Sequence, residues 1–263
     1  MTEAEMEATL NRSKKPRPLH FEWVPALFFR PARTLKTIVE RDHPVWLAPM
    51  LILSVLAILL VLVGAPIRTE QAQQVGELPP DFQYWGPEQQ EEYLAAQGNK
   101  ANPIFIYLFP ALGSLIGIWL SWFLLGSILH LALTLSGSRG SSGQAINLVA
   151  WASIPIALRF IIQAIAISAN HSLIQSAGVS GFIAADAEGF SAFIRTLLGF
   201  VDIYWIWQVV LLMIGVLPLT GLARGKAWTA VLTSALLLLI LQSVPGYVAS
   251  LLGGLSLTRG FFF

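Results

Sequence analysis

Two ionisable side chains fall in stretches that are otherwise almost entirely apolar. Arg159 lies in IPIALRFIIQAI, and Asp202 lies in GFVDIYWIWQVV. If these stretches cross a bilayer, a charge within them costs on the order of 2.5–3.5 kcal/mol on the insertion scale, and it therefore faces a protein partner or a polar cavity. The sequence predicts that Arg159 and Asp202 pair. The alternative is that Asp202 caps a helix start, where the helix dipole favours it, while Arg159 extends towards the membrane surface.

Side-chain amides form the second polar set, at Asn147, Gln163, Gln208 and Gln242. Such amides either line a path for a solute or form interhelical hydrogen bonds, each worth about 0.6 kcal/mol. The second role is the more common one. Pro155 lies in the same region and is expected to kink its helix, because proline removes one backbone hydrogen bond.

Residues for other chemistry are not gathered into any motif. The sequence contains no GxxxxGK[ST], GxSxG, HExxH or GxGxxG pattern, no Cys, and four scattered His residues: His20, His43, His130 and His171. Metal-binding His residues usually recur at short, regular spacing. We therefore predict no catalytic residue, no metal, no cofactor and no enzymatic activity. An intramembrane enzyme would need His and acidic residues to converge at one depth.

Three small residues recur every fourth position, at Gly113, Gly117 and Ser121. On a helix they form a ridge that lets another helix approach closely. The partner helix is either in the same chain or in a second copy of the chain.

Composition indicates what surrounds these residues. Of the 263 residues, 55% are apolar and 12% are charged, with a mean hydropathy of +0.66. Soluble domains carry about 25% charged residues, so this chain is predicted to reside in a bilayer. The net charge of +1 provides no electrostatic basis for nucleic-acid binding.

Five apolar stretches are each long enough to cross the membrane, which takes about 20 residues. They must be helical, because lipid offers no partner to free backbone groups. The prediction is an all-α bundle of five transmembrane helices within residues 44–253, at about 45–63, 109–135, 145–168, 201–222 and 228–252. Residues 1–20 are expected to form a flexible tail without a cleaved signal peptide, and residues 254–263 a short outer tail.

Residues 21–43 form an amphipathic segment before the first span. Pro31 suits the first turn of a helix, after which Ala32, Leu35, Ile38 and Val39 share one face. Basic residues lie outside that face, at Arg30, Arg33 and Lys36. The segment either lies on the membrane surface or packs on the ends of its own bundle, and the two arrangements are compatible.

The distribution of Lys and Arg predicts the orientation. Eight of these residues precede the first span, and the short GLARGKA hairpin adds Arg224 and Lys226. The loop at about 64–103 is acidic. By the positive-inside rule, the N-terminus is cytoplasmic and the C-terminus is outside.

The segments GQAINLVAWASIPIALRFIIQAI and YWIWQVVLLMIGVLPLTGLARGKAWTAVLTSALLLLIL resemble the third to fifth spans of the Ypt/Rab-interacting-protein (Yip) domain family. PALFFRPARTLKTIVERDHPVWLAPMLILSVL is similar to the start of its bacterial members, so that the resemblance covers roughly residues 24–252. It implies a five-helix membrane domain with a cytoplasmic N-terminus. The acidic-Leu-Tyr-Gly-Pro motif of the eukaryotic members is absent, so the resemblance does not extend to binding of Rab GTPases.

The resemblance further implies a non-enzymatic scaffold or accessory subunit, since some bacterial relatives serve ABC-type exporters, or a role in membrane organisation. The expected partners are the lipid bilayer and another membrane protein or a second copy, with no nucleic acid. The alternative function is a small-solute transporter or channel that uses Arg159, Asp202 and the buried amides. Either function places the chain in the cell membrane, the cytoplasmic membrane if it is bacterial.

Overall fold

The apolar stretches fold into helices in the computed structural model, which describes residues 19–41, 43–73, 79, 81–99, 102–174 and 176–252. Within these ranges the regular elements are helical and no strand occurs. Five helical segments are long and apolar enough to cross a membrane: α4 (Leu47–Gln73), the π-helical turn η2 (Ile104–Leu108) with α6 (Phe109–Leu135), α7 (Ser142–Ala152) with α8 (Ile154–Asn170), α10 (Ile203–Thr220) and α11 (Arg224–Leu252). The predicted all-α fold with five candidate spans is confirmed.

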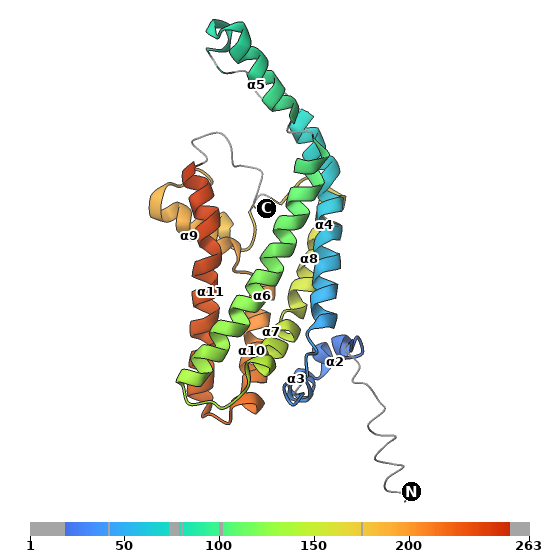
Figure 1. Cartoon of the computed structure of the whole chain (residues 1–263), viewed down its shortest axis with the longest axis vertical. Helices are drawn as coiled ribbons and strands as arrows, with labels where there is room; N and C mark the ends of the chain where they lie inside the picture. Colours follow the sequence, from blue (N-terminus) through green and yellow to red (C-terminus); the bar gives the residue numbers. More distant parts are fainter. Residues whose placement is uncertain are drawn as a thin grey trace, which may run out of the picture.

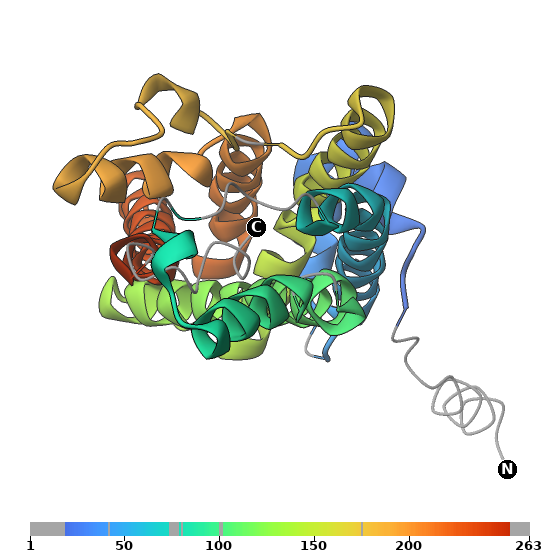
Figure 2. The same cartoon turned by 90° about the horizontal axis from the view of Figure 1, so that it is seen from above.

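The helices form two groups that α6 connects. In Figure 2, α4 and α8 lie on one side of the molecule and α10 and α11 on the other, while α6 runs along both groups. The contacts agree, because α6 packs against α4 and α7 as well as α11, and α10 packs against α7, α8 and α11.

The two ends of the bundle carry different helices. One end holds α2 (Trp23–Phe29), α3 (Pro31–Val39), the turn 136–141 and the hairpin 221–223 (Figure 1). We call it the basic end after Arg30, Arg33, Lys36, Arg139, Arg224 and Lys226. The opposite end holds α5 (Pro87–Asn99), which projects from the bundle, and α9 (Gly189–Gly199). We call it the acidic end after Glu88, Glu91, Glu92, Asp186 and Glu188.

Several boundaries differ from those expected. The first membrane helix continues beyond Val63 to Gln73, and the region 169–200, which lies between the third and fourth predicted spans, contains α9. Phe190, Phe193 and Leu197 give α9 an apolar stripe that the surrounding Gly, Ala and Ser residues dilute in the sequence. Most of the predicted tail 1–20 and all of the tail 254–263 lie outside the described residues.

The third span is broken where Pro155 predicts a kink. Helix α7 ends at Ala152 and α8 begins at Ile154, with Ser153 between them. A capping box begins α7. The Ser141 hydroxyl accepts a hydrogen bond from the backbone N–H of Gln144, and the Gln144 side-chain oxygen accepts one from the backbone N–H of Ser141. Beyond the break, α8 packs against α4 and α10.

The amphipathic segment packs on its own bundle. Helix α3 has Pro31 in its first turn and buries Leu35, Ile38 and Val39 against α7 and α10. Its basic residues stay exposed. Of the two arrangements that the sequence left open, the structure thus shows packing on the bundle, and it leaves the charged face exposed.

Candidate functional site

Arg159 and Asp202 lie in contact between α8 and the start of α10. Arg159 Nη2 donates a hydrogen bond of 2.7 Å to Asp202 Oδ1. Arg159 Nε lies 2.7 Å from Asp202 Oδ2. This second contact is an ion pair and not a hydrogen bond, because the Nε–H does not point at the oxygen. The side chains are 17% and 19% exposed. This geometry is the two-point contact that a planar guanidinium makes with a carboxylate.

Asp202 has a second role in the same place. Its Oδ1 also accepts a hydrogen bond of 2.8 Å from Trp205 N–H, as the N-cap of α10. Asp202 therefore both caps α10 and meets Arg159, so the cap of the alternative is present, whereas Arg159 contacts Asp202 and does not extend to the membrane surface. The carboxylate fastens the start of α10 to α8, while any role of the pair in moving a solute stays a prediction.

Two of the amides connect helices. Gln208 Nε2 donates a hydrogen bond of 2.8 Å to Ser153 Oγ at the break between α7 and α8. Gln242 Nε2 of α11 donates to Ser121 Oγ of α6. Both are interhelical hydrogen bonds of the kind that hold membrane helices together.

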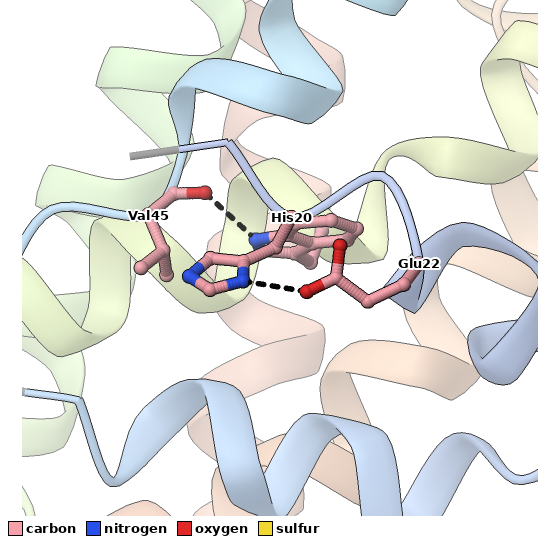
Figure 3. A network of polar contacts seen from close by, with 4 residues as sticks. His20, Glu22 and Val45 are labelled. Atoms are coloured by element: carbon pink, nitrogen blue, oxygen red, sulfur yellow. Dashed lines mark hydrogen bonds and ion pairs between the residues drawn. The ribbon is translucent and has the colours of Figure 1, made fainter. Parts of the chain in front are cut away.

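A third amide connects the bundle to the segment before α4. Asn147 Oδ1 accepts a hydrogen bond of 3.0 Å from Val45 N–H, and Asn147 Nδ2 donates one of 3.1 Å to the His43 carbonyl. Trp151 Nε1 donates a bond of 3.0 Å to the Val45 carbonyl (Figure 3). Together these contacts satisfy both backbone groups of Val45, which is fully buried.

The residues before α2 extend this junction. His20 stacks on Trp23 with ring centroids 4.0 Å apart, and Trp23 in turn lies 5.4 Å from Trp151. His20 Nδ1 lies 2.8 Å from Glu22 Oε1 (Figure 3). We use the name N-terminal junction for His20, Trp23, Val45, Asn147 and Trp151. Sequence reasoning missed it, although Asn147 and Trp151 are four residues apart and therefore share one helix face.

The predicted small-residue ridge is divided. Gly113 and Gly117 are exposed on α6, and no atom lies within 4 Å of a Cβ built on Gly117. Ser121 instead packs within the chain, through its hydrogen bond with Gln242. The described residues therefore occupy the ridge at Ser121 and leave it open at Gly117.

The predicted basic residues lie on the surface of the basic end. Arg30 and Arg33 are exposed around the start of α3, and Arg224 and Lys226 are exposed at the start of α11. Lys36 lies 3.8 Å from Glu40 one helical turn away. Such an exposed pair contributes little to stability.

Metal-binding chemistry finds no support within the part of the chain that the structure describes. There, no group of three or more His, Cys, Asp or Glu side chains is placed to hold a metal ion. Glu88, Glu91 and Glu92 are exposed on α5.

Comparison with known families gives one match. The model of the Yip1 domain family matches residues 26–244, from within α2 to within α11. The matched range contains the Arg159–Asp202 pair and all of the N-terminal junction except His20 and Trp23. No curated protein matches the chain. No solved structure matches it either.

Proposed function

Because the chain belongs to the Yip1 domain family, we propose that this multi-pass membrane protein is a non-enzymatic scaffold or accessory subunit. Its partner in this proposal is another membrane protein, with an ABC-type exporter as one candidate, or it acts in membrane organisation. The family match and the five candidate spans support a membrane setting.

The exposure of α6 is the observation that carries the proposal. In the most apolar 18-residue stretch of η2–α6, 6% of the residues are buried, compared with 61% in that of α7–α8. The exposed side chains include Leu112, Ile116, Leu120 and Phe123. Lipid alone can cover such a surface, but Gly113 and Gly117 lie on the same helix and allow a second helix to approach closely.

A site-specific photo-cross-linker tests this surface in native membranes. We place it at Ile116 beside Gly117, and, for comparison, at Val55 of α4, whose side chain is equally exposed at 63%. The proposal expects a discrete protein adduct from Ile116 and lipid adducts only from Val55. The mass of the adduct distinguishes a second copy from another protein.

A substitution strengthens this experiment. Gly117→Leu fills the ridge, so it should remove the adduct from Ile116 while the protein still folds. A chain that gives only lipid adducts at both positions, or an adduct that survives Gly117→Leu unchanged, would contradict the proposal.

The Arg159–Asp202 pair favours a second candidate, a small-solute transporter or channel. Charged residues within a membrane bundle commonly mark solute or proton pathways. The test is flux in reconstituted vesicles with the Arg159→Met/Asp202→Ser variant, because Ser can still cap α10. Unchanged flux would dispose of this candidate.

We also propose that the basic end faces the cytoplasm, as the positive-inside rule predicts. The chain contains no Cys, so single Cys residues at Ser141 and Glu91 can be labelled without background. Ser141 should react with an impermeant thiol reagent only from the cytoplasmic side, and Glu91 only from the other side. Labelling of both positions from one side would refute this orientation.

A further inference from the structure

The bend between α2 and α3 exposes two large aromatic side chains. Arg30 separates the helices with φ −140° and ψ 58°. Phe28 is fixed to the bundle, because its ring meets Trp207 of α10 edge-on with centroids 5.2 Å apart. Phe29 is 84% exposed. An apolar ring is thus held outward at a bend that is itself fastened to α10.

Cationic side chains lie at the same end of the bundle as this ring, on three segments that each adjoin α10. Helix α3, which begins directly after Arg30, packs against α10. The turn with Arg139 approaches the end of α10, since a Cβ built on Gly140 would lie 3.2 Å from Leu219 Cδ1. The hairpin leads directly from α10 to Arg224 and Lys226 at the start of α11.

Within the described ranges, no carboxylate pairs with the cations of these three segments apart from Lys36. The described residues form two ion pairs at the basic end, Lys36 with Glu40 and His20 with Glu22. The third ion pair, Arg159 with Asp202, lies elsewhere in the bundle. Arg30, Arg33, Arg139, Arg224 and Lys226 are all exposed. They therefore present positive charge that the described part of the protein does not neutralise.

An exposed aromatic ring beside a cation favours one environment, the boundary between lipid acyl chains and headgroups. Phe29 favours hydrocarbon, whereas the guanidinium of Arg30, the next residue, favours water or an anion. Both are satisfied together at the boundary between acyl chains and headgroups. Arg side chains also bind phosphate with two parallel hydrogen bonds.

We propose that Phe29, Arg30, Arg33, Arg139, Arg224 and Lys226 form a platform that binds anionic phospholipid headgroups. Phe29 enters the acyl chains, and the cations contact the headgroup phosphates of the same leaflet. Charge complementarity commits the platform to acidic lipids, since each basic residue near such a surface raises affinity about fivefold. Phosphatidylcholine, with no net charge, lacks this gain.

The experiment measures thermal unfolding of the full chain in neutral detergent while phosphatidylglycerol is added. Parallel titrations use phosphatidylcholine and inorganic phosphate. A ligand that binds only the folded state raises the unfolding temperature, and the rise grows with the logarithm of the ligand concentration divided by its Kd. The test variant is Arg30→Gln/Arg33→Gln/Arg224→Gln/Lys226→Gln.

A matched control removes the same number of charges outside the platform. Arg12→Gln/Lys14→Gln/Lys15→Gln/Arg17→Gln lowers the net charge equally. If the four-residue platform variant does not fold, Arg30→Gln/Arg33→Gln replaces it, with Lys14→Gln/Lys15→Gln as its control. Unfolding temperatures without added lipid establish that each variant is folded.

The proposal expects phosphatidylglycerol to raise the unfolding temperature of the parent chain and of the control. The platform variant should need at least tenfold more phosphatidylglycerol for an equal rise, because each of its four removed charges is worth about fivefold in affinity. Equal stabilisation by phosphatidylcholine or by inorganic phosphate would overturn the proposal. So would an unchanged platform variant, or a control that loses the effect to the same extent.

Discussion

The half of the bundle next to the basic end holds most of the large side chains that are fully buried, whereas the half next to the acidic end, which we call the open half, holds few of them. Large side chains from α3, α6, α7 and α10 are fully buried in the first half, including Leu35, Leu129, Trp151 and Leu212. In the second half α6 and α10 expose large side chains such as Ile116 and Ile203. The helices also diverge towards the acidic end in Figure 1.

The solvent around each half accounts for this difference. Between helices in lipid there is no hydrophobic driving force, because acyl chains are as apolar as Leu. Helix α3 is no span, and its apolar face avoids water by packing on the bundle. A dense core therefore forms around α3, while the Arg159–Asp202 pair connects α8 to the start of α10 in the open half.

The same substitution in the two halves gives the strongest test of this comparison. Leu35→Ala removes a side chain that is 0% exposed, and Leu120→Ala removes one that is 52% exposed on α6. The first should lower the free energy of unfolding by about 4 kcal/mol, because it leaves a cavity. The second should change it by about 0.5 kcal/mol or less. Denaturant titration in mixed micelles measures both. Equal losses of unfolding free energy would contradict the difference in packing between the two halves.

The Arg159–Asp202 pair tests whether a polar contact holds the open half together. Arg159→Met or Asp202→Ser alone leaves a charge with little solvent, so either should destabilise by about 3 kcal/mol. The double variant removes both charges and keeps a cap on α10. It should be more stable than either single variant, as the same titration will show. A double variant whose loss equals the sum of the two single losses would mean that the pair is not coupled.

Much of the fold follows from local signals in the sequence. Five apolar stretches predict the spans, Pro155 predicts the break before α8, and Pro31 predicts the start of α3. Each of these signals acts within a few residues of itself. Helix α9 was not predicted, because its 11 residues are too few for their apolar stripe to stand out among small residues.

Less of the candidate site than of the fold could be predicted from the sequence. The sequence predicts that Arg159 and Asp202 pair, because both fall in the spans and bear opposite charges. The N-terminal junction could not be predicted, since Asn147 and Val45 are 102 residues apart. Nothing local tells which helix face meets which backbone group. The functional role of the pair and of the Gly113–Gly117 surface stays a prediction.

Two glycines sharpen the comparison at the level of single atoms. A Cβ built on Gly215 of α10 would lie 2.2 Å from Leu148 Cδ1 and 3.3 Å from Leu35 Cδ1, whereas one on Gly117 would meet nothing within 4 Å. Gly215→Leu should therefore destabilise by about 2 kcal/mol through overpacking. Gly117→Leu should be neutral or slightly stabilising in the isolated chain, since Gly is a poor helix former. Thermal unfolding in detergent compares them, and a destabilised Gly117→Leu would show that this ridge is already occupied.

The smallest effect concerns two amides, one in each environment. Asn147→Leu leaves the buried Val45 N–H and the His43 carbonyl without their partner, and an unsatisfied buried group is expensive. We expect a loss of about 1.5 kcal/mol. Gln242→Leu breaks a bond between two side chains, and Ser121 can turn its hydroxyl to a backbone carbonyl of its own helix. Its loss should stay near 0.6 kcal/mol. Unfolding free energies of the two variants in the same micelles measure the difference, and a larger loss for Gln242→Leu would place the essential polar contacts in the open half.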